Sequence, residues 1–428
     1  MAESRLKILL IWPWPRLWAM GEGSGVREGW EFLHGILRRG HVLHTIAPLG
    51  SRLNVGRSDG SHSVTVAPWK EIRFGGGRLL SHFWRPFSYL FFQIAYLVRA
   101  IPIAARERPD IVVGISSLSA PVAFIVSRML RVPGTIKLHG VFYRKRNWPR
   151  PYDFLRNFEE FIAVKLPFER IFIVEDGTQA RELVRSTGAA DSRVSFLLSG
   201  TSLEWLENGG RARDLREEFD LERDSVLFVA LSRVVRWKRL DRLIRAAKIA
   251  LTMTHHPVYF LIFGDGEEKE KLLELRASLG VERNVRLLEA LKQEDVENCL
   301  RGSDVFVSVS DFTNGGVATR EAMICGLPVV AANVGHTSNV VIDGETGFLV
   351  NADSRIELAQ KLAILANDRE MRVRMGTKAK EFAKMTFRSW TQRVDTEVRE
   401  MLEVAGVAID RSIENGEVFA DETSAVSA

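Results

Sequence analysis

Two cations five residues apart are the first side chains in this sequence whose spacing could do chemistry. Arg233 and Lys238 follow an apolar run at 225–230 and precede an amphipathic helical pattern that begins near Asp241. In an open α/β sheet this position is the carboxyl end of a strand, where ligands bind. Two fixed cations there suit a diphosphate that must carry growing negative charge. The alternative is a basic loop that faces solvent, because Arg and Lys are mostly exposed.

A second constellation lies within residues 304–350. Gly315 and Gly316 stand between an apolar run and a helical pattern that starts near Val317. Bare backbone N–H groups at the helix start would therefore face a phosphate. Glu321 falls one turn inside the helix, where a carboxylate can accept both hydroxyls of a ribose.

The plainer interpretation of the same stretch is helix capping. Thr313 or Asn314 would cap the helix, which is worth about 1 kcal/mol, and Glu321 would be a surface acid. The length and order of the whole block favour the nucleotide interpretation over this one.

Strand-like apolar runs alternate with longer helical patterns along most of the chain, which predicts βαβ units around parallel sheets. We expect the α/β class, with an N-terminal domain over 1–205 and a C-terminal domain over 206–390. A helix at 391–407 is expected to return to the N-terminal domain, and 408–428 to form a mobile acidic tail. The runs lie at 7–12, 42–48, 110–115, 134–139, 170–176, 193–198, 225–230, 258–263, 304–309 and 327–333.

The amino-acid composition indicates which structural class the protein belongs to and in which redox compartment it folds. With 428 residues, 46% hydrophobic and 26% charged, the chain is globular rather than fibrous or disordered. Cys299 and Cys325 are too few for a disulfide scaffold and are not spaced as a metal motif, which favours a reducing compartment. Residues 51–150 hold 16 basic and 4 acidic side chains, so an anionic partner is expected there.

Further motifs connect these sites in a fixed order. The glycine loop GEGSG is followed by a helical pattern that ends in Gly-His, then by KLHG with His139, and then by the pair Arg233 and Lys238. In chain order the quoted segments lie at 21–25, 36–41, 137–140, 197–206, 233–238, 263–266 and 321–331. Together they resemble the retaining GT-B glycosyltransferases of family 4, which include sucrose-phosphate synthases and many bacterial cell-envelope mannosyl- and glucosyltransferases.

The resemblance implies a GT-B fold, with two Rossmann-like domains facing each other across a cleft. It implies transfer of a sugar, with retention and without a metal or other cofactor, from a UDP- or GDP-sugar held by the C-terminal domain. Arg233 and Lys238 would neutralise the leaving diphosphate, Glu321 would bind the ribose, and His139 would bind the donor sugar from the opposite wall. The remaining donor-binding positions would be Gly23, Gly25, Gly264, Ala290, Thr313, Asn314, Gly315, Gly316 and Val317.

The sequence also departs from the family pattern. Thr313 stands where the family has the first Glu of its E-x7-E motif, which bears on the choice of donor sugar. Ser199 replaces the usual Asn, Glu289 a Gly and Asn339 a Glu. A catalytically inactive protein that binds nucleotide or glycan is therefore the rival from a different functional class. A lone His at a strand end, such as His139, is also more often structural than catalytic.

The stretch 78–108 is apolar and aromatic but is interrupted by Arg85, Pro86, Gln93 and Arg99, so we expect no membrane span. It suits a helix at a membrane surface, and an ordinary core helix is the alternative. Arg144 and Arg146 follow His139 on the expected acceptor side.

These features predict a glycan or lipid-linked acceptor and a cytoplasmic protein that is peripheral on the inner membrane face. A soluble small-molecule acceptor is the alternative. Nucleic acid is not expected as a partner, because no recognised nucleic-acid fold accompanies the basic window at 51–150.

Overall fold

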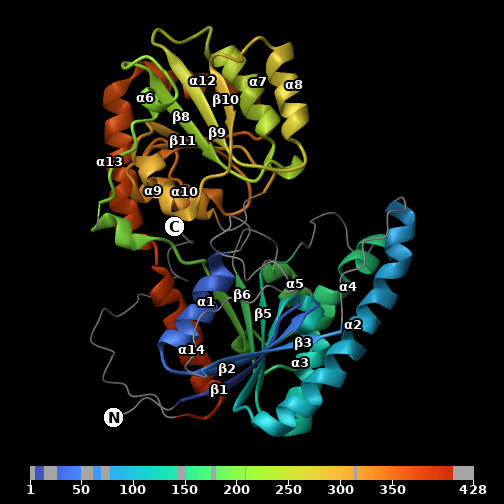
Figure 1. Cartoon of the computed structure of the whole chain (residues 1–428). Helices are drawn as coiled ribbons and strands as arrows, with labels where there is room; N and C mark the ends of the chain where they lie inside the picture. Colours follow the sequence, from blue (N-terminus) through green and yellow to red (C-terminus); the bar gives the residue numbers. More distant parts are fainter. Residues whose placement is uncertain are drawn as a thin grey trace.

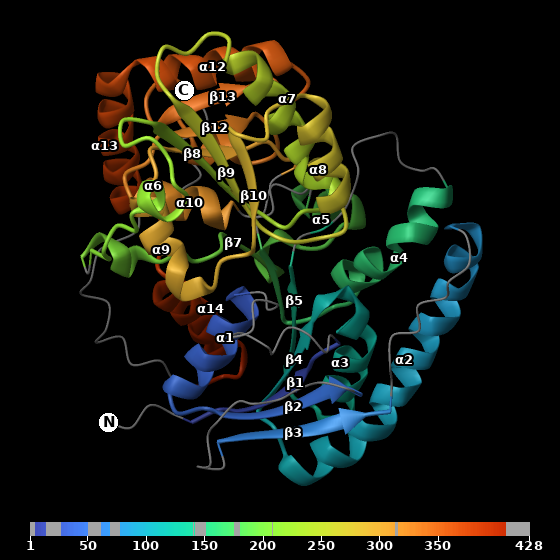
Figure 2. The ribbon, with the colours of Figure 1, turned by 45° about the horizontal axis from the view of Figure 1, so that its top comes forward.

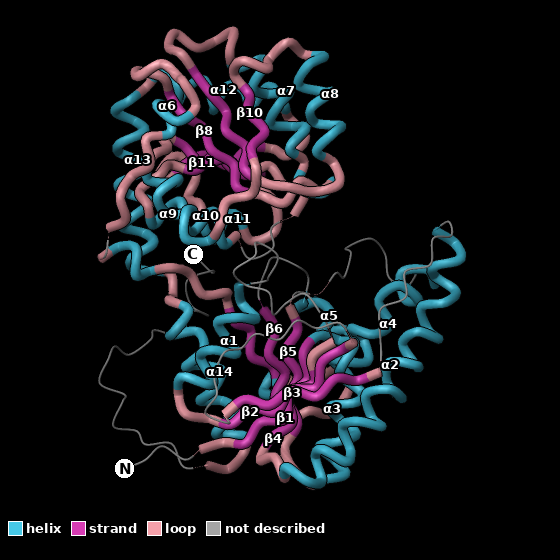
Figure 3. The backbone as a smooth tube through the Cα atoms, in the orientation of Figure 1, coloured by secondary structure: helices cyan, strands magenta, loops and turns pink. Residues whose placement is uncertain are grey.

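The computed structural model describes residues 5–13, 27–49, 61–68, 78–139, 141, 151–174, 180–207, 209–312 and 316–407. For residues 27, 78–85 and 151–157 only the helical backbone is described. In Figure 1 two α/β domains lie one above the other, and the chain runs through the lower domain, then the upper one, and back to the lower. Figure 3 shows that each domain is a sheet covered by helices.

A seven-stranded parallel sheet organises the N-terminal domain, in the order β3-β2-β1-β4-β5-β6-β7. Its central strands are buried on both faces, as expected for parallel sheets covered by helices. Alternate residues of β1 enter different cores: Leu9 and Ile11 face one helical layer, and Ile8 and Leu10 face the other. The strands are β1 (Lys7–Ile11), β2 (Val42–Pro48), β3 (His62–Ala67), β4 (Ile111–Ile115), β5 (Gly134–Leu138), β6 (Arg170–Val174) and β7 (Val194–Leu197).

Helices cover both faces of this sheet. On one face lie α2 (Arg78–Glu107), α3 (Ser116–Leu130), α4 (Pro151–Lys165) and α5 (Ala180–Thr187). The other face carries α1 (Arg27–Arg38) and the last helix, α14 (Trp390–Val404). Gly35 lets these two helices approach closely, because a Cβ there would lie 2.6 Å from Cγ1 of Val394.

The C-terminal domain is built on a six-stranded parallel sheet in the order β10-β9-β8-β11-β12-β13. The strands are β8 (Val226–Leu231), β9 (Val258–Phe263), β10 (Val285–Leu288), β11 (Val305–Ser308), β12 (Val329–Ala332) and β13 (Gly347–Val350). The helices are α6 (Leu215–Glu218), α7 (Leu240–Ala250), α8 (Lys269–Ser278), α9 (Gln293–Arg301), α10 (Val317–Ile324), α11 (Thr337–Val340), α12 (Arg355–Asn367) and α13 (Arg369–Thr386). Short 3-10 turns are η1 (Asp191–Arg193), η2 (Leu203–Leu206) and η3 (Arg236–Lys238).

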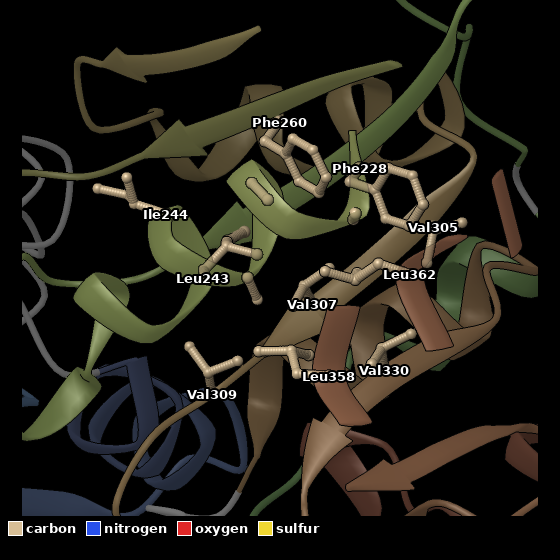
Figure 4. Packing of buried hydrophobic residues seen from close by; sticks show 14 of the residues in the cluster. Phe228, Leu243, Ile244, Phe260, Val305, Val307, Val309, Val330, Leu358 and Leu362 are labelled. Atoms are coloured by element: carbon tan, nitrogen blue, oxygen red, sulfur yellow. The ribbon is translucent and has the colours of Figure 1, made fainter. Parts of the chain in front are cut away.

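Two cores hold this second sheet between its helices. Figure 4 shows one of them, in which Phe228 and Phe260 from neighbouring strands lie beside Leu243 of α7 and Leu362 of α12. The Phe228 and Phe260 rings stack with their centroids 5.0 Å apart. The other core packs α10 and α13 on the opposite face of the sheet. Helices therefore cover both faces of the sheet. A ligand site is expected at the ends of its strands.

The chain crosses between the domains twice, and the crossings are joined to each other. The backbone N–H of Thr201 donates to the carbonyl of Arg388 at 3.0 Å. Gly200 lies directly on the other crossing, because a Cβ there would be 2.6 Å from Cα of Trp390. Residues before α14 and after β7 therefore form one double-stranded connection between the domains. Figure 2 shows the two domains from a second angle.

Helix α2 has two different faces. Phe92 and Tyr96 are fully buried, and the Tyr96 hydroxyl donates to the carbonyl of Trp12 at 2.8 Å. Residues on the opposite side, such as Phe91 and Val98, are more than half exposed. The core-helix interpretation of the sequence therefore describes the face of α2 with Phe92 and Tyr96. The surface-helix interpretation describes the opposite face, with Phe91 and Val98.

Helix α2 also contains a stretch with the hydropathy of a membrane span. Pro86–Glu107 is the one helix in the described part of the chain that is long and apolar enough to cross a membrane by length and composition, with a mean hydropathy of 1.4. We expected its polar interruptions to prevent this. Gln93 and Arg99 are too few to lower the hydropathy of the whole stretch below the level of a span. Length and composition alone are weak evidence, since core helices of soluble proteins pass the same test.

Candidate active site

A cavity of about 260 Å³ lies at the carboxyl ends of β8 and β11. Its lining includes Arg233 and Lys238 from the segment after β8, and Gly316 and Val317 from the start of α10. The two constellations that the sequence suggested separately therefore share one cavity. This is the edge at which parallel α/β sheets bind ligands.

The turn after β9 holds the cationic loop in place. The N–H of Val234 donates to the carbonyl of Asp265 at 2.8 Å, and the N–H of Glu268 donates to the carbonyl of Val234 at 3.1 Å. Gly264 must be a glycine, because a Cβ there would overlap the carbonyl oxygen of Ser232. The structure thus places Gly264 behind the Arg233 loop and not among the residues that line the cavity.

The two cations have no carboxylate partner within salt-bridge distance among the residues that the structure describes. Both lie near one aromatic ring: Nζ of Lys238 is 4.3 Å and Cζ of Arg233 is 5.5 Å from the centroid of Trp237. Burial, with a smaller contribution from the charge of Arg233, lowers the pKa of Lys238 to about 8. The cavity is therefore a site of strong positive potential that an anion would relieve.

The start of α10 adds to this potential. Gly316 has φ +55°, in the left-handed region, and none of the side chains that the structure describes caps the first turn. The first N–H groups of a helix have no partner within the helix. The residues of this turn, 316–319, line the cavity. Backbone N–H groups and two cations therefore meet at one point, which is a suitable arrangement for a phosphate.

Glu321 lies deeper than the sequence suggested. It is 4% exposed, its carboxylate accepts a hydrogen bond from Oγ of Ser202 at 3.3 Å, and it is not among the residues that line the cavity. The neighbouring Arg320 is 2% exposed and donates to the carbonyl of Ser199. Helix α10 is thus fastened to the first crossing between the domains.

Arg320 was not identified from the sequence. Burial lowers its pKa to about 10, while Glu321 and Glu28 act in the opposite direction. Its guanidinium lies 5.8 Å from the ring centroid of Phe387, at the second crossing. One buried side chain therefore contacts both connections between the domains.

A buried ion network lies in the N-terminal domain next to His139. Nζ of Lys137 on β5 is 2.9 Å from Glu397 of α14 and 3.3 Å from Glu28 of α1. Arg393 is 2.8 Å from Glu397 and 3.6 Å from Glu28. We refer to these four residues as the buried network. All four are less than 10% exposed, so α1, β5 and α14 are joined by compensated charges.

The charges of the buried network shift the pKa of one of its members, Glu28, and of its neighbour His139. Burial would raise the pKa of Glu28, but Lys137, His139 and Arg393 together lower it to about 2. Burial also lowers the pKa of His139 to about 4, with Glu28 opposing and Lys137 assisting. His139 is therefore neutral at physiological pH. Oγ of Ser199 donates to Glu28 at 3.2 Å, which connects the network to the crossing that Arg320 contacts.

Several predicted site residues lie outside the described residues or away from the cavity. Outside are Gly23, Gly25, Arg144, Arg146, Thr313, Asn314 and Gly315. Ala290 is exposed and does not line the cavity, and Arg99 is exposed on α2. Only the backbone of Arg85 is described. In the described ranges no three His, Cys, Asp or Glu side chains are grouped to hold a metal ion.

Comparison with known proteins places this geometry in context. Residues 212–382 match the family model described as "Glycosyl transferases group 1". A D-inositol 3-phosphate glycosyltransferase from Thermobifida fusca is 29% identical over 65% of this chain and 66% of its own length. An N-acetyl-alpha-D-glucosaminyl L-malate synthase from Bacillus anthracis is 25% identical over 86% of this chain and 90% of its own.

A solved structure gives the same picture of the fold. Anabaena Alr3699/HepE in complex with UDP superposes with a TM-score of 0.68 and 18% identity, covering 93% of this chain and 100% of that one. Likeness at this identity shows the fold alone. It confirms the prediction of two Rossmann-like domains in the GT-B arrangement.

Proposed function

We propose that this chain, which has the GT-B fold and whose residues 212–382 match the family model "Glycosyl transferases group 1", is a retaining, metal-independent glycosyltransferase that uses a nucleotide-diphosphate sugar. One observation carries the proposal. Arg233, Lys238 and the start of α10 line one cavity at the strand ends, and the two cations have no carboxylate partner among the described residues. A leaving diphosphate would supply the missing charge.

The proposed catalysis is electrostatic. As the bond between the sugar and the diphosphate breaks, negative charge grows on the β-phosphate and positive charge on the sugar. Arg233 and Lys238 are already fixed beside the departing group, so little reorganisation is needed at the transition state. With a pKa of about 8, Lys238 is protonated at neutral pH. These two side chains would supply the positive charge for which other transferases use a divalent cation.

The remaining site residues are assigned by position. Glu321 would bind the ribose after releasing the Ser202 hydroxyl that it now accepts from. Neutral His139 would offer a ring nitrogen to a hydroxyl of the donor sugar. UDP is the favoured nucleotide, because the similar Anabaena protein was solved with UDP, and GDP is the alternative. No organic cofactor is part of the proposal.

Two acceptor classes remain in the proposal. A lipid-linked or envelope glycan suits the basic first half of the chain, where residues 51–150 hold 16 basic and 4 acidic side chains. A small soluble acid or phosphate is the second candidate, because the names of two relatives specify inositol 3-phosphate and L-malate. A phosphate-bearing lipid carrier and a small acid or phosphate are both anionic, which agrees with the charge of this window.

The test is a transfer assay with the whole chain. Purified protein is incubated with a panel of UDP- and GDP-sugars and with lipid-linked, malate and inositol-phosphate acceptors, with and without a chelator. NMR then gives the anomeric configuration of the product. We expect a product that keeps the configuration of the donor and a rate that the chelator does not change. An inverted product, or a rate abolished by the chelator and restored by a divalent metal, would reject the mechanism. Nucleotide binding without turnover on the full panel would favour the inactive binding protein.

A further inference from the structure

Helix α2 exposes a strip of large apolar side chains along one side. Residues three or four apart on a helix lie on the same face. The members of this strip follow that spacing over about three turns. They are Leu90 (58% exposed), Phe91 (55%), Ile94 (53%), Val98 (62%) and Ile101 (36%). Single exposed apolar residues are ordinary, but a contiguous row is typical of an interaction surface. We refer to these five residues as the α2 strip.

The opposite side of α2 is fixed to its domain. Phe92 and Tyr96 are fully buried and stack with ring centroids 4.1 Å apart. Tyr96 donates to the Trp12 carbonyl at 2.8 Å, and Nε2 of Gln93 donates to the carbonyl of Leu118 at 2.9 Å. Crossing a bilayer would require all of these contacts to break. The α2 strip is therefore the outer surface of a packed helix, and any membrane contact would be made in the plane of the surface.

The surroundings of the α2 strip are basic. The sequence has no acidic residue from 72 through 106. Arg99 and Arg108 are exposed, and the Arg106 side chain is 70% exposed, with Glu107 as its partner at 2.8 Å. Figures 1 and 2 place α2 on the outer flank of the N-terminal domain, on the side of the sheet away from α1 and α14. An occupant of this surface must accept both apolar side chains and arginines.

We propose that the α2 strip docks the protein on an anionic lipid bilayer. The apolar side chains would lie at the boundary between headgroups and acyl chains, and the arginines would meet lipid phosphates. A second copy of the chain fits less well, because a two-fold contact would place two α2 helices against each other, and residues 78–106 contain no acidic residue that could offset the arginines of the other copy. Charge complementarity therefore favours lipid. The proposal does not depend on which acceptor the protein uses.

Vesicle sedimentation of the whole chain tests the proposal without donor or acceptor, so it can fail independently of the transferase proposal. Vesicles of phosphatidylcholine and phosphatidylglycerol are compared with phosphatidylcholine alone, at low and high salt. The test variant is Phe91→Gln/Ile94→Gln/Val98→Gln. We expect the wild type to bind the anionic vesicles, with binding weakened by salt, and the test variant to lower the bound fraction at least ~10-fold.

A matched control is available on the other domain. Ile356, Val373 and Met385 are 63%, 60% and 79% exposed, and the triple change of these residues to Gln should leave vesicle binding as in the wild type. Thermal unfolding of both triple variants checks that they fold. If the test variant does not fold, the single variant Phe91→Gln replaces it in the vesicle assay.

Three results would overturn the proposal. The wild type would fail to bind anionic vesicles, the two triple variants would bind equally, or light scattering would show a dimer that the α2 changes convert to a monomer. The last result would identify a second copy as the occupant of the strip.

Discussion

Each of the two domains holds a pair of cations, but the charge of one pair is compensated by carboxylates and, among the residues that the structure describes, the charge of the other is not. The buried network in the N-terminal domain matches its two cations with two carboxylates at 2.8 to 3.6 Å. In the C-terminal domain, Arg233 and Lys238 have no carboxylate within salt-bridge distance in the described part of the chain, and they line a cavity. One pair is completed within the fold, and the other pair is left for an anion to complete.

The difference is not a general shortage of acid in the C-terminal domain. Arg239 and Arg242 follow Lys238 closely, and both are paired with Asp311, at 3.1 and 2.8 Å. Arg233 and Lys238, which line the cavity, have no such partner among the described residues. Buried charges must be compensated for the fold to be stable, so compensated pairs indicate a structural role. Unpaired cations that line a cavity, one of them with a pKa lowered by burial, indicate a ligand site.

The largest expected effect separates these two roles by stability. Lys137→Met should destabilise the protein by about 3 to 5 kcal/mol, because it leaves two buried carboxylates with one cation. Lys238→Met should cost less than about 1 kcal/mol, since burial already disfavours its charge, as its pKa of about 8 indicates. Urea unfolding monitored by circular dichroism gives both values. Equal losses in the two variants would contradict the distinction.

Catalysis should show the reverse order. Lys238→Met and Arg233→Gln should each lower the transfer rate by about 10² to 10³, the usual cost of removing a fixed group that stabilises transition-state charge. Circular dichroism should show folded protein in both cases. Arg236→Gln, at an exposed cation in the same turn that does not line the cavity, is the matched control and should turn over at nearly the wild-type rate. If the control loses as much activity as the two site variants, the cavity is not the reaction centre.

Gly264→Ala tests whether the loop that carries Arg233 must be held in place. The new Cβ would overlap the carbonyl of Ser232, so the loop must shift, at a cost of about 1 to 3 kcal/mol in stability. Diphosphate affinity should fall with it. Gly209→Ala is the control, because nothing lies within 4 Å of a Cβ there. Thermal unfolding and nucleotide titration of both variants check this prediction, and indistinguishable variants would refute it.

The smallest expected effect is a pH dependence. Burial lowers the pKa of free Lys238 to about 8, and a bound diphosphate would raise it again. Binding therefore takes up a proton above pH 8, and affinity should fall as pH rises, by at most ~10-fold per pH unit. Lys238→Arg remains charged in this range and should show a flat profile between pH 7.5 and pH 9.5. Parallel profiles for wild type and variant would exclude Lys238 as the titrating group.

The fold was largely predictable from local pattern, with failures that have a physical cause. Long apolar runs predicted most of the strands within one or two residues. We did not predict β3, β10 or β13. All three are outermost strands of their sheets, β3 and β10 are only partly buried, and β13 begins with Gly347. Such strands lack the long continuous apolar run that marks a buried one.

The candidate site likewise has one part that could be predicted from the sequence and one part that could not. Arg233 and Lys238 stand five residues apart, so their convergence was visible in the sequence. The buried network was not visible, since Lys137 and Glu397 are separated by 260 residues and meet only because α14 returns to the N-terminal sheet. Arg320 likewise appears as an ordinary helical residue until the crossing places the Ser199 carbonyl beside it. Contacts that depend on chain topology carry no local signal.

Calorimetric titration of UDP into the wild type, Arg233→Gln and Lys238→Met tests the central claim most directly, which is that the two cations await a diphosphate. A charge-assisted contact is worth about 1.5 to 3 kcal/mol, so each variant should bind UDP about 10- to 150-fold more weakly than the wild type. Uridine, which lacks the diphosphate, should bind all three proteins with the same affinity. UDP affinity that is unchanged in both variants would contradict the account.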